Sequence, residues 1–168
     1  ILATIVLSTL ASYAGIVGEW TVYPAFSNIT EVETAGNITY VLASGGLYSY
    51  NANDQSVTTY DKAKTLSDCS INHIAWCKEA RRLVIVYSNQ NIDLLEANGN
   101  TINIADYYTK SYTGDKTVNG LNVYGAYAYL STGFGIVKIN VKEAYIADTY
   151  NIGIPVKWTH VDATRIYA

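Results

Sequence analysis

One short order of strands and turns repeats along the chain, and this repeat is the feature that most limits how the chain can fold. Four short segments rich in β-forming residues end in tyrosine, at Tyr23, Tyr60, Tyr107 and Tyr150, with spacings of 37, 47 and 43 residues. Between these tyrosines the same order of apolar runs and turn residues returns. A period of ~40–50 residues with four short strands in each unit is typical of a β-propeller. A sandwich or jelly roll also uses many short strands, but it would not repeat this order in register.

The repeat predicts an all-β fold, a β-propeller fragment of about three and a half four-stranded antiparallel blades. We expect an incomplete propeller over residues 15–168, with blades at about 27–60, 70–107, 117–150 and, in part, 156–168. The segment 19–23, "EWTVY", resembles a fourth strand without the other three strands of its blade. It is expected to complete a last blade that this chain does not contain. The other blades of the ring are therefore expected partners of the fragment.

Composition agrees with a packed β-domain. Hydrophobic residues make up 49% of the chain and charged residues only 15%, which argues against disorder. The net charge is −3 and no basic cluster occurs, so nucleic acid is excluded as the expected partner. Turn residues support hairpins at "AGN" (35–37), "ANGN" (97–100) and "YGA" (124–126). No segment has a convincing period of 3.6, so no helix of consequence is expected.

The first residues differ from the rest of the chain. Residues 1–14 form an apolar run that ends in small residues, with Ser12 and Ala14 at positions −3 and −1 of a cleavage site before Gly15. We interpret this run as a partial signal peptide, and the chain, which has no Met, as a fragment. A buried first strand or helix is the alternative. Export would place the protein in the periplasm or at the outer-membrane surface.

A search for catalytic and metal-binding patterns gives none that we would assign. The chain contains neither G-x-S-x-G nor H-E-x-x-H, and His73 and His160 are interpreted as packed or channel-lining residues. Cys69 and Cys77 could form a disulfide in an exported protein, or be two small buried side chains. We therefore predict no enzyme, no metal site and no cofactor. The basic turn at 80–82, "ARR", is expected to be solvated, with an anion contact as the alternative.

The corners between second and third strands carry the candidate binding residues. In a propeller these corners lie on the same face as the connections between blades, around the mouth of the central channel. Loops on a rigid scaffold often carry function, although each corner glycine by itself is best explained by the turn that it makes. Aromatic side chains in this region suit sugar stacking or a peptide contact. The candidate ligand-binding residues are Ser44, Gly45, Asn89, Gln90, Tyr112, Asp115, Thr132 and Phe134.

Several segments resemble a known family. The stretches "EWTVYPAFSNITEV", "YVLASGGLYSYN", "LSDCSINHIAW", "RLVIVYSNQNIDLL" and "YAYLSTGFGIVKIN" are similar to the N-terminal propeller of PorZ-type proteins of the type IX secretion system. That propeller is in turn similar to two-component regulator propeller repeats. The resemblance implies a non-enzymatic exported protein that binds a protein or a glycan such as lipopolysaccharide. The alternative is a carbohydrate-sensing periplasmic propeller of a hybrid two-component regulator. A propeller enzyme would need acidic or His side chains clustered at the channel mouth.

Overall fold

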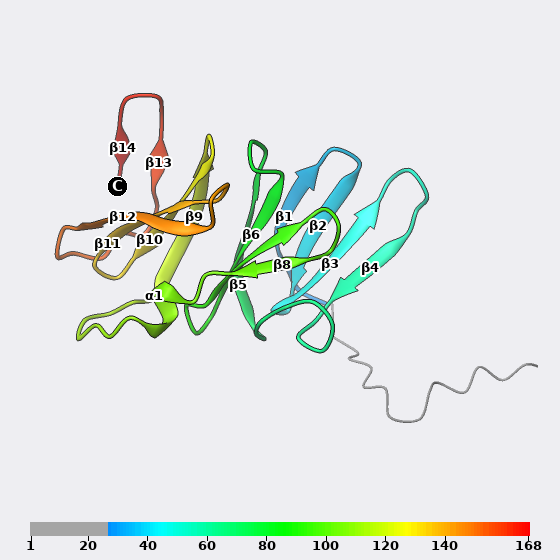
Figure 1. Cartoon of the computed structure of the whole chain (residues 1–168), viewed down its shortest axis with the longest axis horizontal. Coiled ribbons are helices and arrows are strands. Elements are labelled where there is room, and N and C mark those ends of the chain that lie inside the picture. Colours follow the sequence, from blue (N-terminus) through cyan, green and yellow to red (C-terminus); the bar gives the residue numbers. More distant parts are fainter. Residues whose placement is uncertain (1–26) are drawn as a thin grey trace, which may run out of the picture.

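The computed structural model describes residues 27–168, which form a row of small antiparallel β-sheets (Figure 1). The first sheet contains β1 (Ile29–Ala35), β2 (Ile38–Ala43), β3 (Gly46–Asn51) and β4 (Val57–Tyr60). The second contains β5 (Ile71–Cys77), β6 (Arg82–Tyr87), β7 (Ile92–Glu96) and β8 (Thr101–Asn103). The third contains β9 (Val118–Tyr124), β10 (Tyr127–Thr132), β11 (Gly135–Asn140) and β12 (Tyr145–Asn151). A hairpin of β13 (His160–Val161) and β14 (Ile166–Tyr167) follows.

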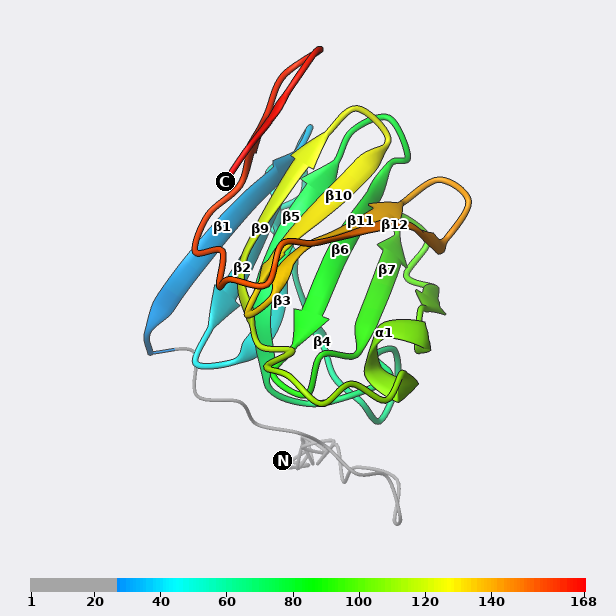
Figure 2. The same cartoon turned by 90° about the vertical axis from the view of Figure 1, so that its left-hand side faces the viewer.

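Within each four-stranded sheet the strands pair in chain order, and consecutive sheets stack face to face (Figure 2). This is the arrangement of blades in an open β-propeller, and it confirms the predicted fold class. The proposed signal peptide at 1–14, the closing strand at 19–23 and Tyr23 lie outside the described residues. In the part of the chain that the structure describes, no helix is long and apolar enough to cross a membrane.

Alternate residues of a strand pack into different hydrophobic cores, which explains why the central blade is apolar on both faces. In β6, Leu83 and Ile85 join the core between the first and second sheets, whereas Val84 and Val86 join the core between the second and third. All four side chains are fully buried. Burial of each such side chain contributes about 1.5–3 kcal/mol to the free energy of unfolding. A strand of a sheet that lies between two other sheets therefore has consecutive apolar residues, here "LVIVY" in β6.

The repeated tyrosines within the described residues pack against the hydrophobic cores between sheets. Tyr60 packs against the core between the first and second sheets, Tyr107 lies in the next core, and Tyr150 packs against the core under the β13–β14 hairpin. One expectation was wrong, because Tyr107 does not close a strand. Strand β8 ends at Asn103, and Tyr107 lies in the single-turn helix α1 (Asp106–Thr109). That turn points the Tyr107 ring into the core and lets its hydroxyl donate to the Lys116 carbonyl at 2.8 Å.

Side chains bridge the inner edges of neighbouring blades. The Glu31 carboxylate on β1 accepts a hydrogen bond from the Ile74 backbone N–H on β5 at 2.7 Å, and its other oxygen lies 2.7 Å from His73 Nδ1. Further along the row, the Asn72 amide donates to the Val118 carbonyl at 3.1 Å, and the Asn119 amide repeats this contact one blade later, to Val156 at 2.9 Å. These bonds satisfy polar groups at strand edges that would otherwise remain unpaired.

Candidate binding face

All three strand corners are tied to the entry of their own blade by the same backbone hydrogen bond. The N–H groups of Ser44, Ser88 and Gly133 donate to the carbonyls of Asn28, Ser70 and Thr117 at 2.9, 2.9 and 3.0 Å. Each acceptor is the residue immediately before the first strand of its blade. The corners and the connections between blades therefore occupy one end of the sheets, at the lower side of Figure 1. We call this end the corner face.

The first corner borders a shallow hollow between the first and second blades. Ser44 and Gly45 line this hollow of about 300 Å³ together with Lys62, Asp68 and Cys69 from the connection to the second blade. Ser44 has a left-handed φ of 50°, and the Gly45 carbonyl accepts the Ile71 N–H at 3.0 Å. Cys69 is exposed and Cys77 is buried, and both thiols are free.

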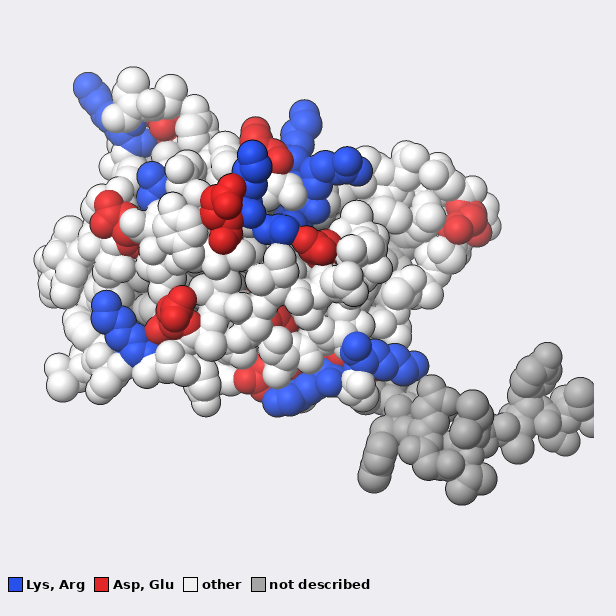
Figure 3. Space-filling view, viewed as in Figure 1, with Lys and Arg blue, Asp and Glu red and all other residues white. Residues whose placement is uncertain are grey.

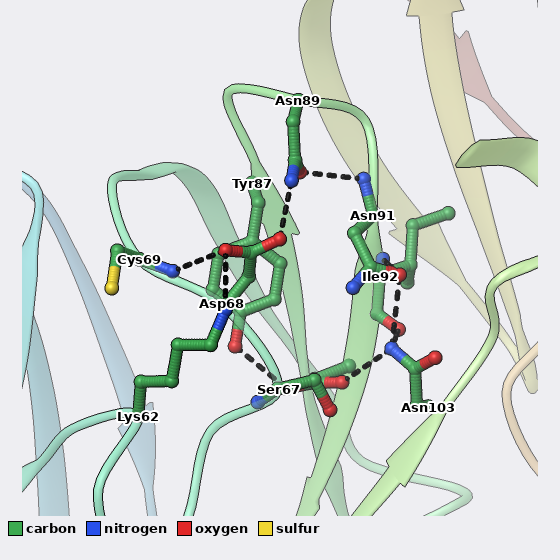
Figure 4. A network of polar contacts seen from close by, with 10 residues as sticks. Lys62, Ser67, Asp68, Cys69, Tyr87, Asn89, Asn91, Ile92 and Asn103 are labelled. Atoms are coloured by element: carbon green, nitrogen blue, oxygen red, sulfur yellow. Dashed lines mark hydrogen bonds and ion pairs between the residues drawn. The ribbon is translucent and has the colours of Figure 1, made fainter. Parts of the chain in front are cut away.

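The second corner is held by a carboxylate from the connection before it (Figure 4). Asp68 accepts hydrogen bonds from the Asn89 side-chain amide, from the Cys69 N–H at 2.9 Å and from Lys62 Nζ at 3.2 Å. These donors, the Asn89 amide first, hold the pKa of Asp68 below its ordinary value. Gln90 folds back on its own corner and donates to the Ser88 carbonyl at 2.8 Å. The side chains of both predicted residues, Asn89 and Gln90, are thus engaged within the protein.

Beneath this corner lies a buried carboxylate that the sequence search did not single out. Asp93 on β7 is fully buried and accepts hydrogen bonds from the Tyr87 hydroxyl at 2.6 Å, the Ser67 N–H at 2.8 Å and the Asn103 amide at 2.9 Å. Burial, and then the Asp93 carboxylate, raises the pKa of Tyr87 above its ordinary value. The signal was an acidic residue inside the apolar run "NIDLL". A buried charge of this kind needs several donors, and the donors here link the connection, the corner and two strands.

The third corner and the long connection before it border a larger hollow. The Tyr112 and Phe134 rings meet with their centroids 4.8 Å apart and their planes at 51°. Together with β11 and β12 they border a hollow of about 480 Å³, and we call it the outer hollow. Phe134 is buried and Tyr112 is 41% exposed. The other residues that line the outer hollow are Asp106, Tyr107, Lys110, Lys116, Val137, Tyr145, Ile146, Asp148, Thr149 and Asn151.

The remaining predicted residues, Asp115 and Thr132, shape this corner. Thr132 is fully buried, and its hydroxyl donates to the Gly135 carbonyl at 2.9 Å. The Asp115 carboxylate accepts the Thr117 N–H at 2.8 Å and lies against Gly133, where a Cβ atom would be 2.6 Å from the carboxyl carbon. Hydrogen bonds from Thr117, its side chain first, lower the pKa of Asp115.

The eight predicted residues form two groups and not one site. Ser44 and Gly45 border the first hollow, where Asp68 connects them with the Asn89 corner, whereas Tyr112 and Phe134 border the outer hollow. Tyr145 and Lys110 were missed there, because nothing local in the sequence shows that β12 faces the connection. The outer hollow offers aromatic surface, two lysines and two carboxylates, which suits a polar ring-shaped ligand. Within residues 27–168, no group of three His, Cys, Asp or Glu side chains could hold a metal ion.

The fold and this face define a class of protein, a β-propeller module with loops gathered on one face. The family model described as "TSS9, PorZ, N-terminal beta-propeller domain" matches residues 39–168. The chain therefore belongs to the PorZ N-terminal β-propeller family, as the sequence resemblance suggested. No curated protein sequence matches the chain.

Solved structures agree with this assignment. PorZ of Porphyromonas gingivalis, described as an essential bacterial surface component of the type-IX secretion system, is 32% identical with a TM-score of 0.71. The match covers 75% of this chain but only 17% of that one. The extracellular domain of the putative hybrid two-component system BT4673 from B. thetaiotaomicron is 17% identical, with a TM-score of 0.64 and coverage of 81% and 19%. AztD from Citrobacter koseri is 16% identical, with a TM-score of 0.63 and coverage of 83% and 40%. The last two show a shared fold.

Proposed function

We propose that this chain is part of a non-enzymatic, exported propeller that recognises a glycan through the outer hollow, as a PorZ-type component of the type IX secretion machinery at the cell surface. Family membership supports the secretion role, since the related PorZ is a surface component of that system. A surface component meets both proteins and cell-surface glycans, and lipopolysaccharide is the glycan that we would test first. A protein ligand on the same face is the other form of this proposal.

The single observation that carries the proposal is the aromatic pair at the mouth of the outer hollow. The ring of Tyr112 is 41% exposed although it leans on Phe134, so one side of the pair is available to a ligand. Tyr145, 48% exposed, also lines this hollow. Aromatic faces of this kind stack on sugar rings, and Lys110, Asp106 and Asp148 can bind hydroxyl groups.

The test is a glycan array that includes lipopolysaccharide, probed with the full-length protein and two variants. Tyr112→Ala removes the stacking surface, and Tyr124→Ala removes a tyrosine of similar exposure, 42%, from the last position of β9 at the other end of the sheets. Binding that is lost with Tyr112→Ala and kept with Tyr124→Ala supports the proposal. A folded protein that binds no glycan contradicts sugar recognition and shifts the search to protein partners.

A second candidate is a carbohydrate-sensing propeller of a hybrid two-component regulator. The fold shared with the BT4673 extracellular domain over 81% of the chain favours it. The two candidates differ in what the rest of the gene encodes. A membrane-spanning segment followed by a kinase would favour the sensor, and a C-terminal secretion domain would favour the PorZ-type role.

A further inference from the structure

A second sizeable hollow opens between the first and second blades, at the end of the sheets opposite the corner face. Its volume is about 650 Å³, within the range of ~300–1,000 Å³ that is typical of small-molecule sites. The turns β1–β2, β3–β4, β5–β6 and β7–β8 each contribute to its rim, through Gly36, Ser56, Lys78, Arg81 and Ala97. We call it the turn hollow, and nothing in the proposed function uses it.

Aromatic side chains form the apolar wall of the turn hollow. Trp76 from β5 stacks on Tyr40 from β2 with ring centroids 6.0 Å apart and planes at 22°, and Tyr60 lies 6.2 Å from Tyr40. The three rings come from both blades, and Trp76 is half-buried. A ring-shaped molecule that enters the hollow would therefore meet a preformed aromatic surface.

One hydroxyl in this wall has no hydrogen-bond partner among residues 27–168. Tyr40 is only 4% exposed, yet its hydroxyl forms no hydrogen bond with any residue in 27–168. No fully buried side-chain oxygen in that range is left unpaired, so the Tyr40 hydroxyl must reach the hollow that its ring lines. Burial raises the pKa of Tyr40 to about 12, so the hydroxyl stays protonated and can donate. The Tyr60 hydroxyl differs, because it pairs with Ser49 Oγ at 3.1 Å.

The charged side chains that line the rim in the described part of the chain are both cations, although Glu79 lies between them in the same turn. Lys78 and Arg81 line the turn hollow, and no carboxylate is among its lining residues in the described part of the chain. The neighbouring Arg82 is bound by Glu96, through Nη2 at 2.7 Å, and by the Val141 and Lys142 carbonyls at 3.0 and 2.9 Å. Figure 3 shows basic side chains gathered above the middle sheet, some beside acidic groups. Neither Lys78 nor Arg81 forms an ion pair within residues 27–168.

The turn that carries these cations departs from the repeat. The equivalent turns of the first and third blades have two residues between strands and place Gly36 and Gly125 at the left-handed position, with φ of 66° and 59°. In the second blade the turn has four residues, 78–81, and Arg81 has the left-handed φ of 54°. A side chain there costs backbone energy that glycine avoids. The four-residue turn 141–144 of the third blade has Ala144 at its last position with a similar φ of 58°, so a turn of this kind does not itself require an arginine.

We propose that the turn hollow binds a small carboxylate carried on a six-membered ring. The ring lies against Trp76, the carboxylate meets Lys78 and Arg81, and the Tyr40 hydroxyl donates to a ligand oxygen. Aromatic and sugar rings share this chemistry, and the test separates them. The site is distinct from the outer hollow because it lies at the other end of the sheets.

Isothermal titration of the full-length protein with two matched pairs tests the proposal. Benzoate is compared with benzamide, and glucuronate with glucose. At least one acid is expected to bind at least ~10-fold more tightly than its neutral counterpart, since charge-assisted hydrogen bonds are the strong ones. Binding of benzoate would show that the ring is aromatic, and binding of glucuronate would show that it is a sugar.

Three variants decide whether binding occurs at this hollow. Arg81→Gly removes the guanidinium at a left-handed φ of 54° that glycine adopts without strain, so the variant is expected to fold and to bind ~10-fold more weakly. Tyr40→Phe removes only the hydroxyl and is expected to weaken binding ~3–10-fold. Lys142→Gln changes an exposed lysine on another turn and serves as the unchanged control. Equal binding of acid and neutral ligand, no binding of either acid, or full affinity in Arg81→Gly and Tyr40→Phe would overturn the proposal.

Discussion

The Tyr87 hydroxyl donates a 2.6 Å hydrogen bond to the carboxylate of Asp93, and both side chains are fully buried. The two residues lie diagonally on neighbouring strands, because Asp93 on β7 is paired with Ile85 of β6 and not with Tyr87. Because Asp93 also accepts the Ser67 N–H, this pair fixes the connection between the first and second blades. The geometry of the corner face therefore depends on a polar cluster inside the second blade.

Replacing Tyr87 with Phe keeps the ring and removes only the donor. We expect the free energy of unfolding to fall by about 1–3 kcal/mol, because a buried carboxylate loses a hydrogen bond. Denaturant unfolding of the full-length protein measures the change. Tyr60→Phe is the control, since its hydroxyl pairs with the neutral Ser49 and should cost only about 0.5–1.5 kcal/mol. An unchanged midpoint for Tyr87→Phe would show that the pair adds nothing to stability.

Gly135 is required by the corner after β10. Its φ is 149°, and a Cβ atom there would lie 2.0 Å from the Tyr150 carbonyl oxygen. Gly135→Ala is expected to destabilise the protein by roughly 2–4 kcal/mol, because backbone of β12 would have to move. Gly125→Ala provides the comparison, as its φ is 59° but nothing lies within 4 Å. It should cost only about 1 kcal/mol. Thermal unfolding curves of the two variants give the difference, and equal losses would contradict the clash.

Glu33 makes stability depend on acid pH. Burial raises the pKa of Glu33 above the ordinary value of 4.5, a hydrogen bond from the Trp76 backbone N–H opposes this, and the charge of Glu31 adds to the rise. A carboxyl group whose pKa rises on folding stabilises the folded state fully below 4.5 and loses that contribution as pH increases through the folded value. Glu33→Gln keeps an acceptor for Trp76 and cannot ionise.

The Glu33→Gln variant is therefore expected to match the native protein near pH 3 and to exceed its stability at pH 7. Urea unfolding at a series of pH values measures the gap between them. Glu143→Gln, at an exposed turn position, corrects for the change in net charge. A gap that is constant across the series would mean that Glu33 does not titrate differently in the two states.

Arg81→Gly should stabilise the protein even though it removes the side chain from the turn hollow. At a φ of 54° glycine avoids the steric cost of a side chain, and part of this gain is offset by the greater freedom of glycine in the unfolded chain. The net gain is expected to be about 0.5–1 kcal/mol. The melting temperature of the full-length protein reports it. A lower melting temperature would assign Arg81 to the fold itself.

The sequence by itself determined the architecture. Alternating side chains in runs such as "LVIVY", together with glycine at hairpin turns, specify short strands, and the repeat of that order specifies stacked blades. These signals are local, because neighbouring residues and the twofold alternation of a strand decide them. The family resemblance followed from the same stretches. The one clear error, Tyr107 at a strand end, arose where a single helical turn replaced the last residues of the expected strand.

Only the tertiary structure decided which polar and aromatic side chains meet. Asp68 and Asn89, Tyr112 and Phe134, and Tyr40 and Arg81 are each separated by more than 20 residues. The first two pairs meet where a connection contacts a corner, and the third pair lines a hollow between two blades. Such contacts depend on how one sheet is placed against the next and on the path of the connections, which no local pattern encodes. The residues that form the fold could therefore be read from the sequence, whereas the hollows that a ligand would enter could not.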